Sequence, residues 1–210
     1  MSADGAMHHP VRIQMEQNLS RFDPHLIGDT KLKRASVAVI TGLDNTRPAF
    51  VLTRRAARLR GHAGQWAFPG GRHEPGETAL QAAIRETHEE LNLPITFAHC
   101  LGRLDDYETR SGYTISVFVF WADISNAEPN ADEVASIHRF DLSRLDRPGS
   151  PELVPGPDPE RPIIRMHVGP PGTGLDIHAP TGAILHQFHE VAVNGRHTRV
   201  AHFDQPDWAK

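Results

Sequence analysis

The segment 78–91 constrains the fold most strongly, because the sequence specifies both of its ends and one of its faces. Thr78 and Gln81 have the spacing of a capping box, which starts a helix. Asn92 tolerates the left-handed conformation that ends helices, and Pro94 prevents continuation. A stripe at helical spacing, suited to a core, consists of Leu80, Ile84, Thr87 and Leu91. We therefore predict an amphipathic helix that packs by one face.

The opposite face of this helix concentrates negative charge. Glu86, Glu89 and Glu90 fall within an arc of roughly 100°, because each helical residue advances about 100°. Arg85, four residues before Glu89, is the cation at helical pairing distance, and one guanidinium cannot balance three carboxylates. A solvated acidic face is one explanation. The other is a metal site, since carboxylates at this spacing can converge on hard divalent cations such as Mg²⁺ or Mn²⁺.

The rest of the chain supplies strands and a second helix. The β-rich runs 35–40 and 49–54 are separated by strong turn chemistry and should pair as neighbours. Further strand candidates are 98–104, 113–122, 133–140 and 163–168. Near the C-terminus a second amphipathic helix is predicted from Ile184, Leu185, Phe188, Val191 and Ala192. These elements indicate an α+β domain with a mixed sheet between helices.

Two segments lack a clear pattern. Residues 1–34 are polar, and we expect them to be irregular apart from a short helix near 18–22. The segment 55–77 is rich in glycine and proline, and we expect a long loop there. Long loops in compact domains are often functional.

Composition narrows the class of partner. Hydrophobic residues at 39% and charged residues at 23% fit a globular domain, and a formal charge of −4 gives no general attraction to nucleic acid or anionic membranes. No apolar run reaches membrane-spanning length, and the N-terminal residues lack the apolar core of a secretory signal. Cys100 is the single cysteine and cannot form an intrachain disulfide. We expect a cytoplasmic protein that acts on a small molecule.

The stretch GGRHEPGETALQAAIRETHEELNL, residues 70–93, resembles the Nudix hydrolase box, GX5EX7REUXEEXGU with U a bulky aliphatic residue. The matching positions are Gly71, Glu77, Arg85, Glu86, Glu89, Glu90 and Leu93. Thr87 and Asn92 depart from the pattern, which affects packing more than chemistry. The resemblance implies a Nudix-type α/β/α sandwich. Residues 1–34 would then be an N-terminal extension, and residues 35–210 a single domain with a C-terminal helical extension.

The resemblance also implies a set of metal ligands. Glu86 and Glu90 would ligate Mg²⁺ or Mn²⁺, and Gly70 would donate a backbone carbonyl. Glu89 would ligate a second ion or serve as the general base.

Other residues would support the chemistry. Arg85, which we count with the catalytic residues, and Glu77 would hold the loop against the helix, although a purely structural ion pair would use the same geometry. Some Nudix enzymes take their general base from a distal loop, which makes Glu133 in the acidic stretch 129–134 a candidate. An exposed charge at a strand start is the alternative.

Upstream, VLTRRAARLRGHAGQWAFPGG, residues 51–71, resembles the additional motif of coenzyme A diphosphatases, LLTXR followed by Ser or Ala, then X3RX3GX3FPGG. Its arginines make a local positive patch suited to an extra phosphate such as the 3′-phosphate of coenzyme A, or else brace the loop. They are Arg54, Arg55, Arg58 and Arg60. Trp66 would either stack on adenine or pack into the core.

We therefore expect a divalent-metal-dependent hydrolase of a nucleotide diphosphate, first of all one that cleaves coenzyme A to 4′-phosphopantetheine and adenosine 3′,5′-bisphosphate. The C-terminal extension lies outside the coenzyme A motif, so hydrolysis of ADP-ribose or of an NADH-type dinucleotide stays open. A non-catalytic nucleotide-sensing module is the third reading, and assembly into a homodimer is left open.

Overall fold

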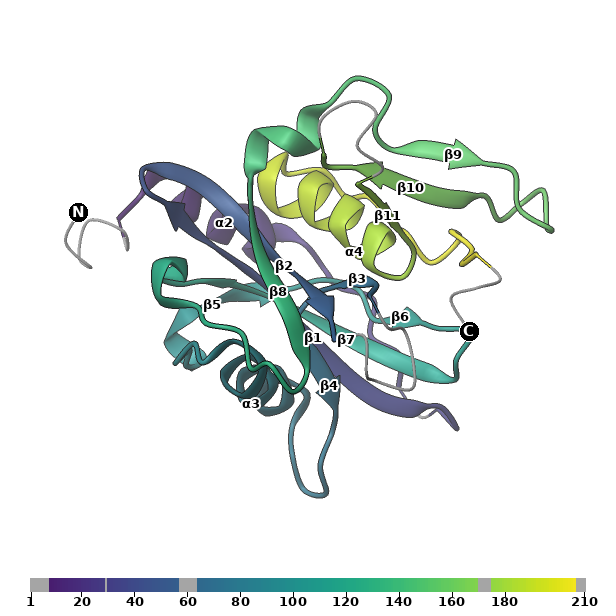
Figure 1. Ribbon diagram of the computed structural model, residues 1–210. Helices are drawn as coiled ribbons and strands as arrows, with labels where there is room; N and C mark the ends of the chain where they lie inside the picture. The colour runs from purple at the N-terminus through teal and green to yellow at the C-terminus, as the bar shows by residue number, and fades with distance from the viewer. Residues whose placement is uncertain (1–7, 29, 57–63, 170–174, 207–210) are drawn as a thin grey trace.

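The computed structural model describes residues 8–28, 30–56, 64–169 and 175–206, and in these residues a mixed β-sheet lies between helices (Figure 1). The sheet has the order β3-β2-β1-β7-β5, with β4 paired to β1, β6 to β7 and β8 to β2. Its strands are β1 (Lys33–Asp44), β2 (Arg47–Arg55), β3 (Trp66–Ala67), β4 (Gly70–Arg72), β5 (Cys100–Arg103), β6 (Tyr107–Glu108), β7 (Tyr113–Trp121) and β8 (Val134–Asp141). β1 pairs parallel with β7 and antiparallel with β2, which confirms a mixed sheet.

The hairpin predicted from the first two β-rich runs is present. β1 and β2 pair antiparallel as far as Asp44, which lies opposite Arg47. In the turn between them Asn45 adopts φ 56°. Asparagine tolerates this left-handed conformation, which a tight hairpin turn requires. The other predicted strands correspond to β5, β7, β8 and a later strand, β10.

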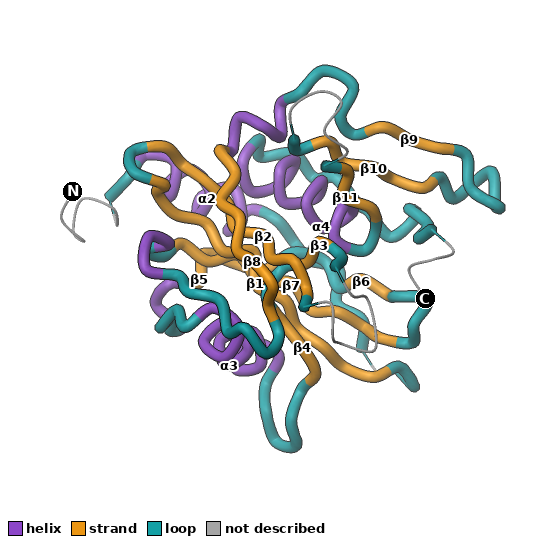
Figure 2. The backbone as a smooth tube through the Cα atoms, in the orientation of Figure 1, coloured by secondary structure: helices purple, strands orange, loops and turns teal. Residues whose placement is uncertain are grey.

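Helices cover both faces of the main sheet (Figure 2). α3 (Ala79–Leu91) packs on one face, where Ala83 and Leu91 meet Ile40 of β1. On the other face, Val39 of β1 joins a core shared with α2 (Pro10–Arg21) and α4 (Thr181–Phe188). Alternate strand residues point to opposite faces, so one strand serves both cores. The predicted sandwich architecture is confirmed.

The N-terminal region is more ordered than its sequence suggests. We expected an irregular segment with a short helix near 18–22, but α2 spans Pro10–Arg21. Met15 and Leu19 are buried, and the Asn18 side chain donates to the carbonyl of Ala192 at 2.9 Å. The helix carries few apolar residues, so its order comes from docking, which local periodicity does not reveal.

A small second sheet precedes the C-terminal helix. It has the order β11-β10-β9 and consists of β9 (Glu152–Val154), β10 (Ile163–His167) and β11 (Asp176–His178). α4 packs against β10 and continues into a π-helical segment, η4 (His189–Val193), so the predicted C-terminal helix is confirmed. The segments η1 (Phe97–His99), η2 (Ile124–Asn126) and η3 (Leu142–Asp146) are short 3₁₀ helices.

The segment 55–77, predicted as a loop without regular structure, contains the two short strands β3 and β4. Trp66 of β3 lies opposite Arg54 of β2, and Gly70 of β4 lies opposite Val37 of β1. These pairings fasten the segment to the sheet despite its glycine and proline content.

Within the described ranges, no helix combines the length and the apolar character needed to cross a membrane.

Candidate active site

The ends of α3 are built as the sequence predicts. The Thr78 hydroxyl accepts from the amide of Gln81 at 3.3 Å, and the Gln81 side chain accepts from the amide of Thr78 at 2.9 Å. Asn92 ends the helix with φ 53°. Thr87, at an aliphatic position of the box, is fully buried and donates to the carbonyl of Ala83 at 2.7 Å. This internal bond satisfies its hydroxyl, so the departure from the pattern leaves no unpaired group.

The three glutamates of α3 differ sharply in their surroundings. The Glu89 side chain is 48% exposed, that of Glu86 is 13% exposed and that of Glu90 is 5% exposed. A solvated acidic face, one of the two explanations for this charge, therefore does not describe Glu90. The end of β2 and the strand β4 contact it: the amide of Gly70 donates to Glu90 at 3.2 Å, and an Arg55 nitrogen lies 3.8 Å away.

Glu133 completes a carboxylate cluster with two of these residues. One oxygen from each of Glu86, Glu90 and Glu133 lies within 4.8 Å of the others. Glu133 directly precedes β8, and its loop is fastened to α3 because the amide of Asn130 donates to the carbonyl of Glu90 at 2.9 Å. Glu89 does not join this cluster. Its carboxylate instead accepts from Arg85 at 2.8 Å.

Burial and like charge perturb the acids of this cluster. Burial raises the pKa of Glu90 to about 8, the Arg55 guanidinium and the Gly70 amide oppose the shift, and the carboxylates of Glu86 and Glu133 add to it. Burial is also the main cause that raises the pKa of Glu86. Carboxylates held together in this way need positive charge to ionise fully. All donor atoms are oxygens, so the cluster fits a hard divalent cation such as Mg²⁺ or Mn²⁺.

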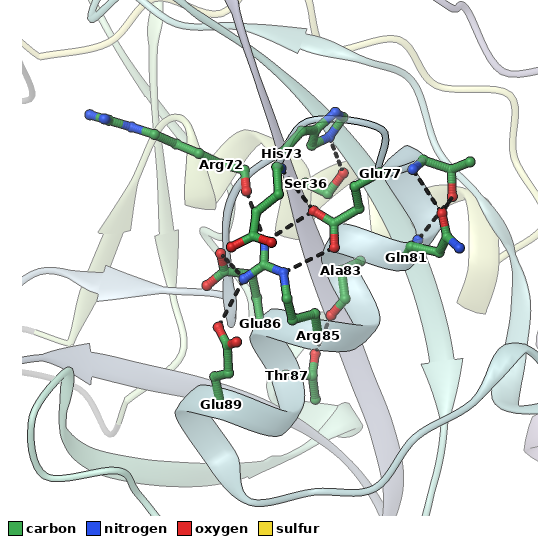
Figure 3. A network of polar contacts seen from close by, with 12 residues as sticks. Ser36, Arg72, His73, Glu77, Gln81, Ala83, Arg85, Glu86, Thr87 and Glu89 are labelled. Carbon is green, nitrogen blue, oxygen red and sulfur yellow. Dashed lines mark hydrogen bonds and ion pairs between the residues drawn. The ribbon is translucent and has the colours of Figure 1, made fainter.

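Arg85 organises the network around the cluster (Figure 3). Its guanidinium donates to both carboxylate oxygens of Glu77, at 2.9 and 3.1 Å, and to the Arg72 carbonyl at 3.0 Å. It also donates to Glu86 at 2.9 Å, in addition to Glu89. The first of these contacts holds the pKa of Glu77 below its usual range. The expected attachment of the loop to the helix is present in the structure.

Two glycines allow the backbone to approach the cluster closely. A Cβ atom at Gly71 would lie 2.3 Å from a carboxylate oxygen of Glu86, and one at Gly70 would lie 2.2 Å from the carbonyl oxygen of Ser36. A side chain at either position would displace the acids or the strand beneath them. The metal-ligating role of the Gly70 carbonyl stays a prediction.

A cavity of about 530 Å³ adjoins the cluster, a size typical of small-molecule sites. Glu86, Glu90 and Glu133 line it, whereas Glu89 is not part of the described lining. The cavity also has a wall that sequence reasoning missed, formed by Pro180, Thr181, Ile184 and Gln205. The only sequence signal for this wall was a C-terminal amphipathic helix, which does not indicate where that helix docks.

The predicted arginine patch is divided by the structure. Arg55 lies beside Glu90 and lines the cavity, whereas the Arg54 guanidinium lies over the Trp66 ring at 4.7 Å. Arg58 and Arg60 lie outside the described residues. Trp66 is half-buried and lines the cavity. Its ring also packs edge-on against His138 at 4.7 Å.

Comparison with known proteins gives a consistent result. The family model described as NUDIX domain matches residues 32–159, more than half of the chain. A Citrobacter koseri protein, "Uncharacterized Nudix hydrolase NudL", is 34% identical over 142 residues, which cover 65% of this chain and 74% of that protein. A protein of the same name from Yersinia enterocolitica is 38% identical over 97 residues, which cover 45% of this chain and only half of that protein's length.

Among solved structures, a MutT/nudix family protein from Enterococcus faecalis superposes with a TM-score of 0.54 at 14% identity. The match covers 80% of this chain and 64% of that protein. At this identity the likeness supports the fold alone.

Proposed function

From the premise that this chain belongs to the Nudix hydrolase family, we propose that it cleaves the diphosphate linkage of coenzyme A, releasing 4′-phosphopantetheine and adenosine 3′,5′-bisphosphate. The observation that carries the reaction type is the convergence of Glu86, Glu90 and Glu133 at the edge of a ligand-sized cavity.

The cluster is suited to Mg²⁺ or Mn²⁺, with Glu86 and Glu90 as the central ligands. When bound, such an ion neutralises a diphosphate and lowers the pKa of a water molecule toward neutrality. Arg85 orients the Glu86 carboxylate, and the Gly70 amide orients that of Glu90. These contacts hold both acids in place before substrate arrives, which is the arrangement that efficient catalysis requires.

Two residues are candidates for the group that accepts a proton from water. Glu133 lines the cavity, whereas Glu89 is held by Arg85 and lies outside the described lining, so we favour Glu133. Exchange of Glu133 for Gln separates the two possible roles of this side chain. Lost turnover with unchanged Mn²⁺ affinity in calorimetry would support a base, and lost Mn²⁺ affinity would make Glu133 a ligand.

The match of residues 51–71 to the coenzyme A motif supports the substrate. Arg55 lies beside Glu90 and the Arg54 guanidinium lies over the Trp66 ring, so contact of either arginine with the 3′-phosphate stays a prediction. Hydrolysis of ADP-ribose or an NADH-type dinucleotide is the second candidate, since the C-terminal segment, which the motif does not include, supplies four of the cavity residues.

A substrate panel tests the proposal. The purified protein is incubated with Mg²⁺ or Mn²⁺ and with coenzyme A, ADP-ribose, NADH or nucleoside triphosphates, and the products are resolved by chromatography. We expect turnover of coenzyme A. Exclusive turnover of ADP-ribose or NADH would replace the substrate, and tight binding without turnover of any compound would indicate a sensing module.

A further inference from the structure

We propose that Pro180, Thr181, Ile184 and Gln205, here called the C-terminal wall, select the substrate by binding an uncharged, mainly apolar group beyond the diphosphate. This inference rests on the proposed function and extends it to the chemistry of the distal group. All four residues lie outside the range 32–159 that the family model matches, yet they line the same cavity as the carboxylate cluster.

Charge is unevenly distributed around the cavity. In the described lining the acids come from α3 and from the turn before β8, and the cations are Arg55 and Arg72. The C-terminal wall carries no charged side chain. Because a charged group pressed against such a surface would lose its hydration without compensation, the charged part of a ligand belongs at the acidic end, with its metal ions.

The polar atoms of the wall are already engaged with the protein. The Thr181 hydroxyl donates to the carbonyl of Trp66 at 3.1 Å. The Gln205 amide donates to the carbonyl of Glu108 at 3.3 Å and accepts from the backbone of Arg110 at 3.4 Å. What the wall offers a ligand is therefore chiefly the apolar surface of the half-buried Pro180, with Ile184 directly behind it in the lining.

The wall is anchored on two sides. Ile184 belongs to the core that α4 shares with β10, where it is only 3% exposed. The chain around Gln205 is fastened to the β6–β7 connection, since the Tyr107 hydroxyl donates to the Phe203 carbonyl at 2.9 Å and Arg110 pairs with Asp204. A preformed wall selects by shape, because its groups need no reordering on binding.

This surface matches one class of distal group better than another. An arm with alkyl groups, such as the one that coenzyme A carries, can bury them against Pro180 at the place where Ile184 closes the lining. A terminal sugar would bring hydroxyls to a surface whose own polar atoms are engaged, and unpaired hydroxyls are costly to bury. The wall should therefore favour the alkyl arm over the sugar of ADP-ribose.

The test exchanges Ile184 for Ala and uses Leu185→Ala as the matched control. Leu185 is the next residue of α4, is fully buried and is not part of the described lining, so both variants lose core packing but only one changes the cavity. For Ile184→Ala we expect kcat/KM for coenzyme A to fall about tenfold, mainly through KM, while Leu185→Ala leaves KM within about twofold. If Ile184→Ala does not fold, Ile184→Val should give a smaller change in the same direction.

Binding separates failure of this inference from failure of the proposed function. In a Glu86→Gln background, which is expected to stop turnover, calorimetry compares coenzyme A with ADP, which lacks the arm and the 3′-phosphate, and with dephospho-coenzyme A, which lacks the 3′-phosphate alone and should respond as coenzyme A does. Ile184→Ala should weaken coenzyme A about tenfold and leave ADP unchanged.

The proposed role of the C-terminal wall would be wrong if Ile184→Ala weakened the binding of coenzyme A and of ADP equally, or if Ile184→Ala and Leu185→Ala had equal effects. A different outcome is that Ile184→Ala weakens the binding of coenzyme A but not of ADP, while the protein with an intact carboxylate cluster does not hydrolyse coenzyme A. That result would support the role of the C-terminal wall and contradict the proposed reaction. If the protein with an intact carboxylate cluster neither binds nor hydrolyses coenzyme A, both proposals would be wrong.

Discussion

α3 and α4 lie on opposite faces of the main sheet (Figure 1). Side chains of contrasting chemistry from the two helices nevertheless line one cavity. α3 contributes Glu86 and Glu90, which are tied to Arg85 and to the Gly70 amide. α4 contributes Thr181 and Ile184, which carry no charge. The comparison teaches that the reactive end and the selective end of the site come from distant parts of the chain, and that changes to the two helices should have separable effects.

The sharpest test of this division neutralises the acids of α3. Glu86→Gln and Glu90→Gln should each lower kcat by about 10³-fold, because each weakens the several kcal/mol that a bound cation contributes to the transition state. Glu128→Gln is the control, since Glu128 is an exposed acid outside the described lining. Retained kcat in both cluster variants, with Mn²⁺ binding unchanged in calorimetry, would place the reactive end elsewhere.

The second test concerns stability without metal. An unfolded glutamate titrates near its ordinary pKa, while burial in the fold raises the pKa of Glu90 to about 8. Between these values the folded state binds more protons, so the unfolding free energy should fall as pH rises from about 5 to about 8, by on the order of a few kcal/mol. Urea unfolding in a chelator would measure this slope. Glu90→Gln should flatten it, whereas Ile184→Ala should leave it unchanged.

The third test asks whether the α3 side depends on orientation as well as charge. Arg85→Lys keeps the positive charge but loses the bidentate hydrogen bonds to Glu77. We therefore expect kcat/KM to fall about tenfold and the free energy of unfolding to fall by about 2 kcal/mol. Arg47→Lys is the control, because that side chain is 80% exposed and its pairing with Asp141 is long at 3.8 Å. Equal effects in the two variants would show that only charge matters at Arg85.

The smallest expected effect lies on the α4 side. Thr181→Val removes the hydrogen bond to the Trp66 carbonyl and should cost about 1 kcal/mol in urea unfolding, without changing Mn²⁺ affinity. Thr181→Ser keeps the hydroxyl and should restore most of the loss. A change in Mn²⁺ affinity for the valine variant would mean that the two ends of the cavity are coupled.

The sequence reveals the α3 side because its determinants are local. The capping box, the ending at Asn92 and the pair of Arg85 and Glu89 all depend on spacings of three or four residues. Such spacings follow from helix geometry and require no knowledge of the rest of the fold.

The remaining features depend on contacts between distant segments. Helical spacing treats Glu86, Glu89 and Glu90 alike, whereas the contacts that Glu90 makes with Arg55 of β2 and Gly70 of β4 come from distant segments. Glu133 could be named from its acidic loop, but its arrival beside Glu86 depends on the pairing of β8 with β2. The C-terminal wall depends on the docking of α4 against β10, which no local pattern encodes.

The central position of β1 in the sheet fixes the length of one side of the cavity. Ala35 and Val37 line the cavity, and this stretch of β1 is hydrogen-bonded to β4 on one side and to β7 on the other. A strand held along both edges does not stretch, so the span from the acids to Ile184 is set by the backbone itself. If coenzyme A is the substrate, this fixed span predicts a lower kcat/KM for an analogue with one extra methylene between its diphosphate and its arm.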